Sequence, residues 1–288
     1  MKQVSKIILS FFLTALALSH ANAENIALDS LKTFVSPDLT FSIPEPNKAK
    51  AYSLTGEALF DYLHNATEPK VRVISSYQTS KSYMYATADN TGCNGQSGII
   101  TAYSDVCING SGGDGNSYKE QGDTNDDGIL GDFINAEHIW PQSFFNSQLP
   151  MVADIHQLMS TLSVPNGRRA NLKFCEVLET PLYKTSSGSK LGKNCFEPGN
   201  SVKGNVARAI FYFIVRYSDQ NIRQGGMNYK EFWTDNVSMF MKWNRQDPPD
   251  ANEKRRNNLI EKFQGNRNPF IDDPSLVDAI GETVFESH

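Results

Sequence analysis

Two short stretches of the chain bring together residue types that can attack a phosphodiester. The first, residues 135–143, contains Glu137 and His138. The second, residues 165–171, contains an asparagine that is followed within three residues by two adjacent arginines. A carboxylate, an imidazole and an amide, with paired guanidinium groups nearby, are the groups that could hydrolyse a phosphate ester with one hard metal ion. Either stretch alone would be weaker evidence.

Each of these groups has a distinct role in the hydrolysis that we expect. His138 would be the general base, because a neutral imidazole near pH 7 can take a proton from the attacking water. The Glu137 carboxylate and the Asn166 side-chain oxygen would hold one Mg²⁺, with water and phosphate oxygens filling its other positions. Arg169, with Arg168 beside it, would bind the scissile or a neighbouring phosphate through forked hydrogen bonds.

The adjacency of Glu137 and His138 restricts the local backbone. Neighbouring residues on a regular strand point to opposite faces, so both side chains could not reach one phosphate from such a strand. We therefore expect an irregular backbone, with the pair at a strand end or bend and Pro141 preventing continuation of the ladder. Taken alone, the pair is also consistent with a surface acid beside a surface imidazole.

The motifs together resemble bacterial endonuclease I, a family of secreted or periplasmic nucleases of the ββα-metal (His-Me finger) type. The resemblance covers most of residues 55–275. It rests on N-x-E-H-x-W-P-x-S at 135–143, D-x-H-x-L at 154–158, N-G-R-R-x-N at 166–171 and Q-G-N-R-N-P-F at 264–270. Each motif is moderately specific, whereas their order and spacing together are a strong indication.

The resemblance implies roles for particular residues and an activity. His138 would be the general base, Glu137 and Asn166 the Mg²⁺ ligands, and Arg169 the group that stabilises the phosphate or the leaving group. The first strand of the finger would carry the Glu-His pair, residues 154–158 would form the second strand, and a short helix would carry the asparagine. The expected activity is cleavage of DNA, with RNA as a second candidate, with little sequence preference and with 5′-phosphate products.

The chain departs from the family pattern after the D-x-H motif. Members often have a second histidine and, shortly afterwards, a proline, whereas this chain has Gln157 and Ser160. We therefore assign His156 and Gln157 no catalytic role and expect both to be structural. Pro165 should lie in the first turn of the helix that follows, or just before it.

The first 23 residues have the pattern of a secretory signal peptide. Two lysines precede a largely apolar run over residues 7–18, and residues 21–23 form a small-x-small cleavage site. The run is shorter than the roughly 20 apolar residues that span a bilayer. We therefore expect residues 24–288 to form a single secreted or periplasmic nuclease domain, monomeric and without a membrane segment, that begins with an extended arm over residues 24–52.

The net charge is unusual for a protein that binds nucleic acid. It is −5, and loss of Lys2 and Lys6 with the signal peptide changes it to −7, although phosphate affinity comes from Lys and Arg. Residues 119–137 contain six acids and one base, whereas residues 242–267 contain seven bases and four acids. A polarised surface is therefore expected, and exposed arginines on it are either contacts or ordinary solvated residues. The candidate contacts to the nucleic-acid backbone are Arg168, Arg245 and Arg267.

Four cysteines in an exported chain favour two disulfides over free thiols. Sequence order suggests the pairs Cys93–Cys107 and Cys175–Cys195, although three connectivities are formally possible. None of the cysteines has the C-x-x-C spacing of a zinc site.

An acidic segment has the beginning of a calcium-binding loop. Asp123, Asn125 and Asp127 occupy positions one, three and five, and glycine occupies position six, but the twelfth position is Ile134 rather than Glu. A structural Ca²⁺ site and a solvated acidic turn both fit this pattern. The competing function is accordingly a calcium-stabilised extracellular binding protein without catalysis, and a third interpretation is a DNA-binding protein without turnover.

The hydrophobic pattern predicts an α+β protein in which a small irregular sheet carries the motifs and packs against several helices. The predicted helices begin near residues 53–55 and end before Pro69, and cover residues 205–217, 229–243 and 252–263, the last stopped by Gly265. Runs of β-branched and aromatic residues predict strands within residues 71–87 and 99–108. Trp140 and Trp243 are expected in the core, because they lie within apolar segments.

Overall fold

Helix α6 (Lys203–Tyr217) forms the centre of the fold. Every residue of this helix except Asn205 and Arg216 is buried, including an uninterrupted apolar run from Ala209 to Val215. A helix that is apolar on all sides has no face for solvent, so other elements must enclose it. Helices α3, α8 and α10 pack directly against it. The helix predicted over residues 205–217 is therefore confirmed.

The computed structural model describes residues 51–68, 76–120 and 133–288, which lie within one compact unit, Pro44–His288. Besides α6, the helices are α3 (Gly56–Thr67), α4 (Tyr77–Tyr83), α5 (Ser163–Arg169), α7 (Tyr229–Phe232), α8 (Val237–Gln246), α9 (Ala251–Gln264), α10 (Pro269–Asp272), α11 (Leu276–Ile280) and α12 (Glu282–Ser287). The shorter helical turns are η1 (Met84–Ala88), η2 (Gln142–Phe145), η3 (Met151–Ala153), η4 (Ile155–Gln157) and η5 (Thr234–Asn236).

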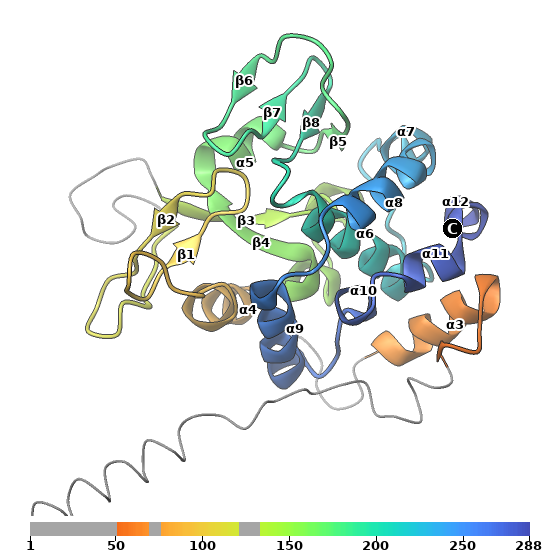
Figure 1. The fold of residues 1–288 in the computed structure, drawn as a ribbon, viewed down its shortest axis with the longest axis horizontal. Helices are drawn as coiled ribbons and strands as arrows, with labels where there is room; N and C mark the ends of the chain where they lie inside the picture. Colours follow the sequence, from red (N-terminus) through yellow and green to blue (C-terminus); the bar gives the residue numbers. More distant parts are fainter. Residues whose placement is uncertain (1–50, 69–75, 121–132) are drawn as a thin grey trace, which may run out of the picture. The chain divides into compact units, whose positions relative to one another are not determined.

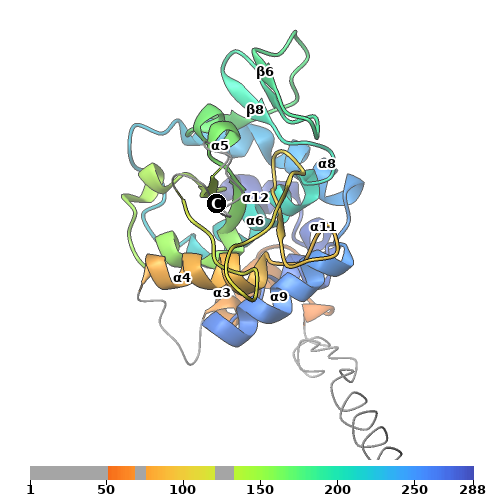
Figure 2. The ribbon, with the colours of Figure 1, turned by 90° about the vertical axis from the view of Figure 1, so that its left-hand side faces the viewer.

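The strands form three small sheets. They are β1 (Ile99–Ile100), β2 (Cys107–Ile108), β3 (Ile134–His138), β4 (Leu158–Leu162), β5 (Lys173–Phe174), β6 (Tyr183–Lys184), β7 (Lys190–Leu191) and β8 (Cys195–Glu197). Two sheets are the pairs β1–β2 and β3–β4, and the third has the order β5-β8-β7-β6. Figure 1 shows most of the C-terminal helices on one side of α6 and β1–β4 on the other. The four-stranded sheet projects next to α5 in both views (Figure 2). Small sheets combined with longer helices confirm the predicted α+β class.

Strands β3 and β4 form an antiparallel ribbon that leads directly into α5. The register pairs Glu137 with Met159 and His138 with Leu158. Because neighbouring residues on a strand alternate between faces, Glu137 and His138 point to opposite faces of the ribbon. The pair does lie at a strand end, but the irregular backbone that we expected is absent there. The ladder of hydrogen bonds is regular up to His138. One residue beyond β3, the backbone N–H of Ile139 still donates to the Gln157 carbonyl at 3.0 Å.

Parts of two segments that were expected to be strands are helical instead. Strands were predicted within residues 71–87; residues 71–75 lie outside the described ranges, and α4 and η1 occupy residues 77–88. The Ser76 hydroxyl caps α4 by accepting a hydrogen bond from the Thr79 amide, which favours a helix despite the β-branched composition. Residues 155–157, expected in the second strand, form η4, which Asp154 caps through the His156 amide. The second strand is the next five residues, β4.

The predicted helix 229–243 is interrupted. It consists of α7 and α8, separated by η5. The Asn236 side-chain amide donates to the carbonyls of Glu231 and Phe232, which satisfies the end of α7 and stops it there. By contrast, α9 is continuous. It begins after its Asp250 cap and is followed by Gly265 in the left-handed conformation, the residue that was predicted to stop it.

Both disulfides follow the predicted pairing. Cys93–Cys107 ties the segment before β1 to β2, and Cys175–Cys195 joins the end of β5 to its neighbour β8. Strands β1 and β2 confirm the strand prediction for residues 99–108, and Trp140 and Trp243 are fully buried, as expected.

Several expectations fall on residues outside the described ranges. These are the signal peptide 1–23, the arm 24–52 except its last two residues, and the calcium loop with Asp123, Asn125 and Asp127. Within the described ranges, no helix combines the length and the apolar character that crossing a bilayer requires.

Candidate active site

Glu137 is buried, and two donors hold one of its carboxylate oxygens. Its Oε1 accepts a hydrogen bond of 2.8 Å from the Tyr103 hydroxyl and lies 2.9 Å from Nη1 of Arg169. Among the residues that the structure describes, none donates to Oε2. Burial raises the pKa of Glu137, and the charge of Arg169 and the hydrogen bond from Tyr103 oppose this shift. Within the described part of the chain, the protein thus holds one carboxylate oxygen and not the other.

His138 is held as a neutral imidazole. Its Nε2 lies 3.1 Å from the Val152 carbonyl oxygen. Because a carbonyl oxygen only accepts, Nε2 carries the hydrogen and Nδ1 keeps its lone pair. Burial is the main cause that lowers the pKa of His138 to about 4; the hydrogen bond to Val152 opposes this shift, and the positive charges of Arg169 and Lys81 add to it. The ring is therefore uncharged at neutral pH and can accept a proton at Nδ1.

Asn166 lies in α5 next to the end of β3. Its Nδ2 donates to the Ala136 carbonyl at 3.3 Å and to Oδ1 of Asn135. These two hydrogen bonds identify the nitrogen of the side-chain amide. They also attach α5 to the two residues that precede Glu137. No described residue donates to Oδ1 of Asn166, which is half-buried. Pro165, the third residue of α5, lies in the first turn as expected.

Arg169 is fully buried, and protein groups hold its guanidinium. Besides Glu137, its guanidinium donates to the carbonyls of His138 at 2.7 Å and Ile139 at 2.6 Å. We expected this side chain to bind a phosphate. In the structure it contacts the Glu137 carboxylate and the backbone at the end of β3. Arg168, on the exposed side of α5, lies over the Tyr183 ring of β6 at 5.7 Å from its centroid.

The two C-terminal arginines have different environments. Arg267 donates to Asp272, Glu261 and Asn258 and is mostly buried, so its position is structural rather than that of an available nucleic-acid contact. Arg245 is about half exposed, and its only ion pair within the described ranges is with Asp278, at 2.7 Å. An exposed pair of this kind contributes little and can be exchanged for another partner.

The D-x-H-x-L and Q-G-N-R-N-P-F motifs meet in a buried polar network. Asp154 is fully buried, and its Oδ1 accepts from Nε2 of Gln264 at 2.7 Å. Its Oδ2 accepts from two tyrosine hydroxyls of α6. His156 donates from Nε2 to the Asn266 carbonyl at 3.0 Å. These motifs connect η4 to the end of α9 and to the central helix, which fixes the start of β4.

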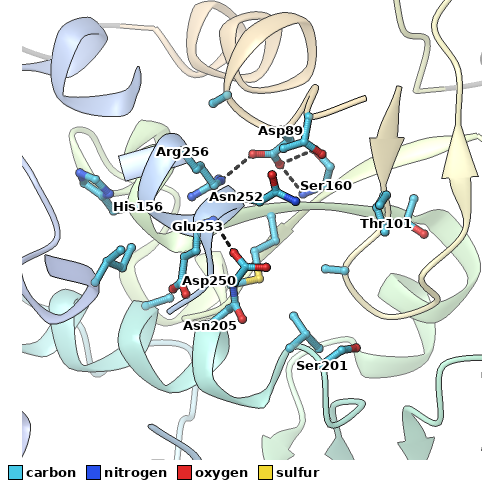
Figure 3. A pocket seen from close by; sticks show the side chains of 18 of the residues that line it. Asp89, Thr101, His156, Ser160, Ser201, Asn205, Asp250, Asn252, Glu253 and Arg256 are labelled. Carbon is cyan, nitrogen blue, oxygen red and sulfur yellow. Dashed lines mark hydrogen bonds and ion pairs between the residues drawn. The ribbon is translucent and has the colours of Figure 1, made fainter. Parts of the chain in front are cut away.

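A cavity of about 450 Å³ lies beside β4, and His156 is one of the residues that line it. Figure 3 shows Asp89 in this cavity between Arg256 and Ser160, which contact it at 2.5 and 2.6 Å. None of the predicted catalytic or Mg²⁺-binding residues lines it. The candidate active site is therefore the corner formed by β3 and α5, not this cavity.

The donor set at this corner fits a hard divalent cation. Clusters of three or more His, Cys, Asp and Glu side chains that could share a metal are absent from the described part of the chain. Glu137 and Asn166 instead offer one carboxylate and one amide oxygen, and Mg²⁺ commonly takes one or two protein ligands with water and phosphate oxygens. In each side chain the other polar atom is held by the protein, so the remaining oxygen is oriented.

Sequence reasoning did not identify Tyr103. It lies 34 residues before Glu137 and outside every motif, so no spacing connects the two. The one available signal was its place inside the loop that the Cys93–Cys107 disulfide closes.

Comparison with known proteins gives three kinds of similarity. A family model described as Endonuclease I matches residues 55–275. The extracellular ribonuclease of Bacillus amyloliquefaciens is 37% identical over 162 residues, which are 53% of this chain and 55% of that protein. An extracellular and a periplasmic deoxyribonuclease of Aeromonas hydrophila are 30% and 31% identical over 125 residues, 42% of this chain and 50% and 48% of those proteins. The chain thus spans about half the length of the curated relatives that it matches.

Proposed function

The chain belongs to the endonuclease I family, and we propose that it is an exported endonuclease that hydrolyses phosphodiester bonds with one divalent metal ion. The observation that supports this most directly is that α5 contacts the end of β3 through two of its residues. Arg169 pairs with the Glu137 carboxylate and donates to the His138 carbonyl, and Asn166 donates to the Ala136 carbonyl. We interpret the β3–β4 ribbon and α5 as the ββα-metal finger. The names of the relatives, which are extracellular or periplasmic nucleases, support export of this chain as well.

His138 is the proposed general base. Its Nε2 hydrogen is held by the Val152 carbonyl, so the Nδ1 lone pair is free to take the proton of the attacking water. The same carbonyl stabilises the imidazolium that results, because Nε2 still donates to it after Nδ1 is protonated.

We propose Mg²⁺ as the cofactor, with Oε2 of Glu137 and Oδ1 of Asn166 as its protein ligands. A bound divalent ion supplies positive charge next to the phosphate oxygens as negative charge develops on them. The protein's part is to present these two oxygens. Tyr103 and Arg169 hold the carboxylate, and strand β3 holds the amide. In this proposal Arg169 is a positioning residue rather than a phosphate ligand.

DNA is the proposed substrate, with RNA as a second candidate, and cleavage would have little sequence preference. Relatives of this chain include proteins named as a ribonuclease and as deoxyribonucleases, so both polymers belong in the test. Entry of water opposite the 3′ oxygen would leave 5′-phosphate ends. Arg168 and Arg245 are the proposed backbone contacts of the monomer, because both are exposed.

The direct test is cleavage of plasmid DNA and of RNA by the purified chain with both disulfides formed. We expect cutting with Mg²⁺ and none with a chelator. His138→Ala should lower the rate by at least about a hundredfold, which is the usual contribution of a general base, while DNA binding persists. His64→Gln is the matched control, because His64 lies in α3, where its Nδ1 contacts the Val215 carbonyl. Cutting by His138→Ala at the wild-type rate would remove the central assignment.

A further inference from the structure

The Tyr103 hydroxyl reaches the candidate metal ligand from a distant part of the chain. Tyr103 is fully buried, and its hydroxyl donates to Oε1 of Glu137 at 2.8 Å. Its ring packs against Phe196 of β8, with 4.8 Å between the ring centroids. We propose that Tyr103 is a positioning residue for metal binding, which holds Oε1 together with Arg169 so that Oε2 faces the ion. This inference rests on the proposed function, because it takes Glu137 as a metal ligand.

Contacts from two other elements fix the backbone that carries Tyr103. The Ser187 hydroxyl donates to the Tyr103 carbonyl at 2.8 Å, and the Ser186 hydroxyl donates to the next carbonyl, also at 2.8 Å. On the other side, the Ala102 amide donates to the Ser160 carbonyl of β4 at 2.9 Å. The segment that carries Tyr103 is thus attached both to the β3–β4 ribbon, which carries Glu137, and to the segment between β6 and β7.

Both disulfide-closed loops contribute to this attachment. The Cys93–Cys107 bond encloses Tyr103, and the Cys175–Cys195 bond encloses Ser187. Two covalently closed loops therefore meet at the residue that contacts the carboxylate. Such closure limits the positions that the tyrosine hydroxyl can take, and an oriented donor is what a preorganised ligand requires.

The chemistry of the donor matters as well as its position. Arg169 also contacts Oε1, and the same Nη1 donates to the His138 carbonyl, so this guanidinium is attached to the backbone of β3 as well as to the carboxylate. A second cation at this place would repel the metal ion, whereas a neutral hydroxyl orients the carboxylate without adding charge. Tyr103 therefore supplies orientation where another arginine or lysine would weaken metal binding.

The test compares Tyr103→Phe with Tyr217→Phe. Tyr217 is the matched control, because it is also fully buried and also donates to a buried carboxylate, Asp154, which keeps a second tyrosine donor. Binding of Mn²⁺ to the disulfide-bonded chain is measured without nucleic acid, from the free Mn²⁺ signal in electron paramagnetic resonance. The Mg²⁺ concentration for half-maximal cleavage, kcat at saturating Mg²⁺ and the unfolding temperature are measured in parallel.

We expect Tyr103→Phe to weaken Mn²⁺ binding about tenfold, the usual effect of losing a partner of a metal ligand. The Mg²⁺ requirement should rise by a similar factor, while kcat at saturating Mg²⁺ stays close to the wild-type value. Tyr217→Phe should leave both metal measurements unchanged, although it lowers the unfolding temperature. A role in stability alone would give the two variants the same metal affinity.

Unchanged Mn²⁺ binding and Mg²⁺ requirement in Tyr103→Phe would overturn the inference, and metal-dependent cutting by the wild type would then leave the proposed function intact. Wild-type protein that neither binds Mn²⁺ nor cuts would refute both. If Tyr103→Phe does not fold, Ser187→Ala takes its place, because this substitution frees the Tyr103 backbone and keeps the hydroxyl. It should weaken Mn²⁺ binding by about two- to threefold, a fraction of the tenfold effect, and unchanged binding would count against the inference.

Discussion

Arg169 is the most deeply buried of the candidate residues. Its guanidinium is paired with Glu137 and donates to two backbone carbonyls. Removing one partner of a buried ion pair leaves an uncompensated charge, which typically costs about 3 to 5 kcal/mol. We therefore expect Arg169→Met to lower the free energy of unfolding in urea by about 3 kcal/mol or more.

Two further variants separate this structural role from phosphate binding. Arg168→Met, which changes an exposed neighbour, should alter the free energy of unfolding by no more than about 0.5 kcal/mol. Adding Glu137→Gln to Arg169→Met should restore part of the lost stability, since the unpaired charge is then removed. An Arg169→Met protein that is as stable as the wild type but inactive would instead favour the original phosphate-binding prediction.

At the scale of elements, Asp154 connects η4 to α6 and to the end of α9. Its carboxylate accepts hydrogen bonds from the His156 amide, the Gln264 side chain and two tyrosines. In Asp154→Ala the His156 amide and the two tyrosine hydroxyls lose this acceptor, while Gln264 still donates to Asn266, and each such loss costs about 1 to 3 kcal/mol. We expect a total loss of at least about 3 kcal/mol in denaturant unfolding.

The control for Asp154→Ala is a substitution of Asp250, whose carboxylate hydrogen-bonds to a single helix. Asp250 caps α9 by accepting from the Glu253 amide at 2.7 Å. Asp250→Ala should therefore cost about 1 kcal/mol, the usual value for an N-cap. Equal losses for the two alanine variants would mean that Asp154 acts as a local cap and does not join separate elements.

At the scale of the whole molecule, two buried histidines make stability depend on pH. Burial lowers the pKa of His138 and of His156 to about 4 in each case. For His156, the charge of Asp154 opposes this shift, while Arg256 and Arg267 add to it. Between pH 4 and the ordinary histidine value near 6.5, the unfolded chain binds more protons than the folded chain. The free energy of unfolding should thus have its full value above pH 6.5 and fall by about 3 kcal/mol per histidine as the pH drops to 4.

Urea unfolding at pH 7 and pH 5 measures this effect. His156→Gln keeps a donor for the Asn266 carbonyl but removes one titrating group, so stability should decrease less between the two pH values. His64→Gln is the control, because it retains both buried histidines. The same decrease in wild type and His156→Gln would show that other groups cause the pH dependence.

The helices that the sequence predicted correctly are those with local signals. Helix α6 has an apolar run that only burial explains, and α9 has an Asp cap and a terminal glycine. Residues 77–87 and 155–157 were predicted wrongly as strands. There, a single cap at Ser76 or Asp154 and packing against distant segments outweighed the β-branched and aromatic composition.

The sequence by itself determined the residue types of the candidate site and the α+β class, because these follow from motif order and local periodicity; it suggested the pairing of the cysteines, which the structure confirms. Only the tertiary structure decided that Arg169 is buried and that Tyr103 contacts Glu137 across 34 residues. Burial and long-range hydrogen bonds depend on which segments pack together in space. A motif records which chemical groups are present, whereas packing fixes which of them meet and which face solvent.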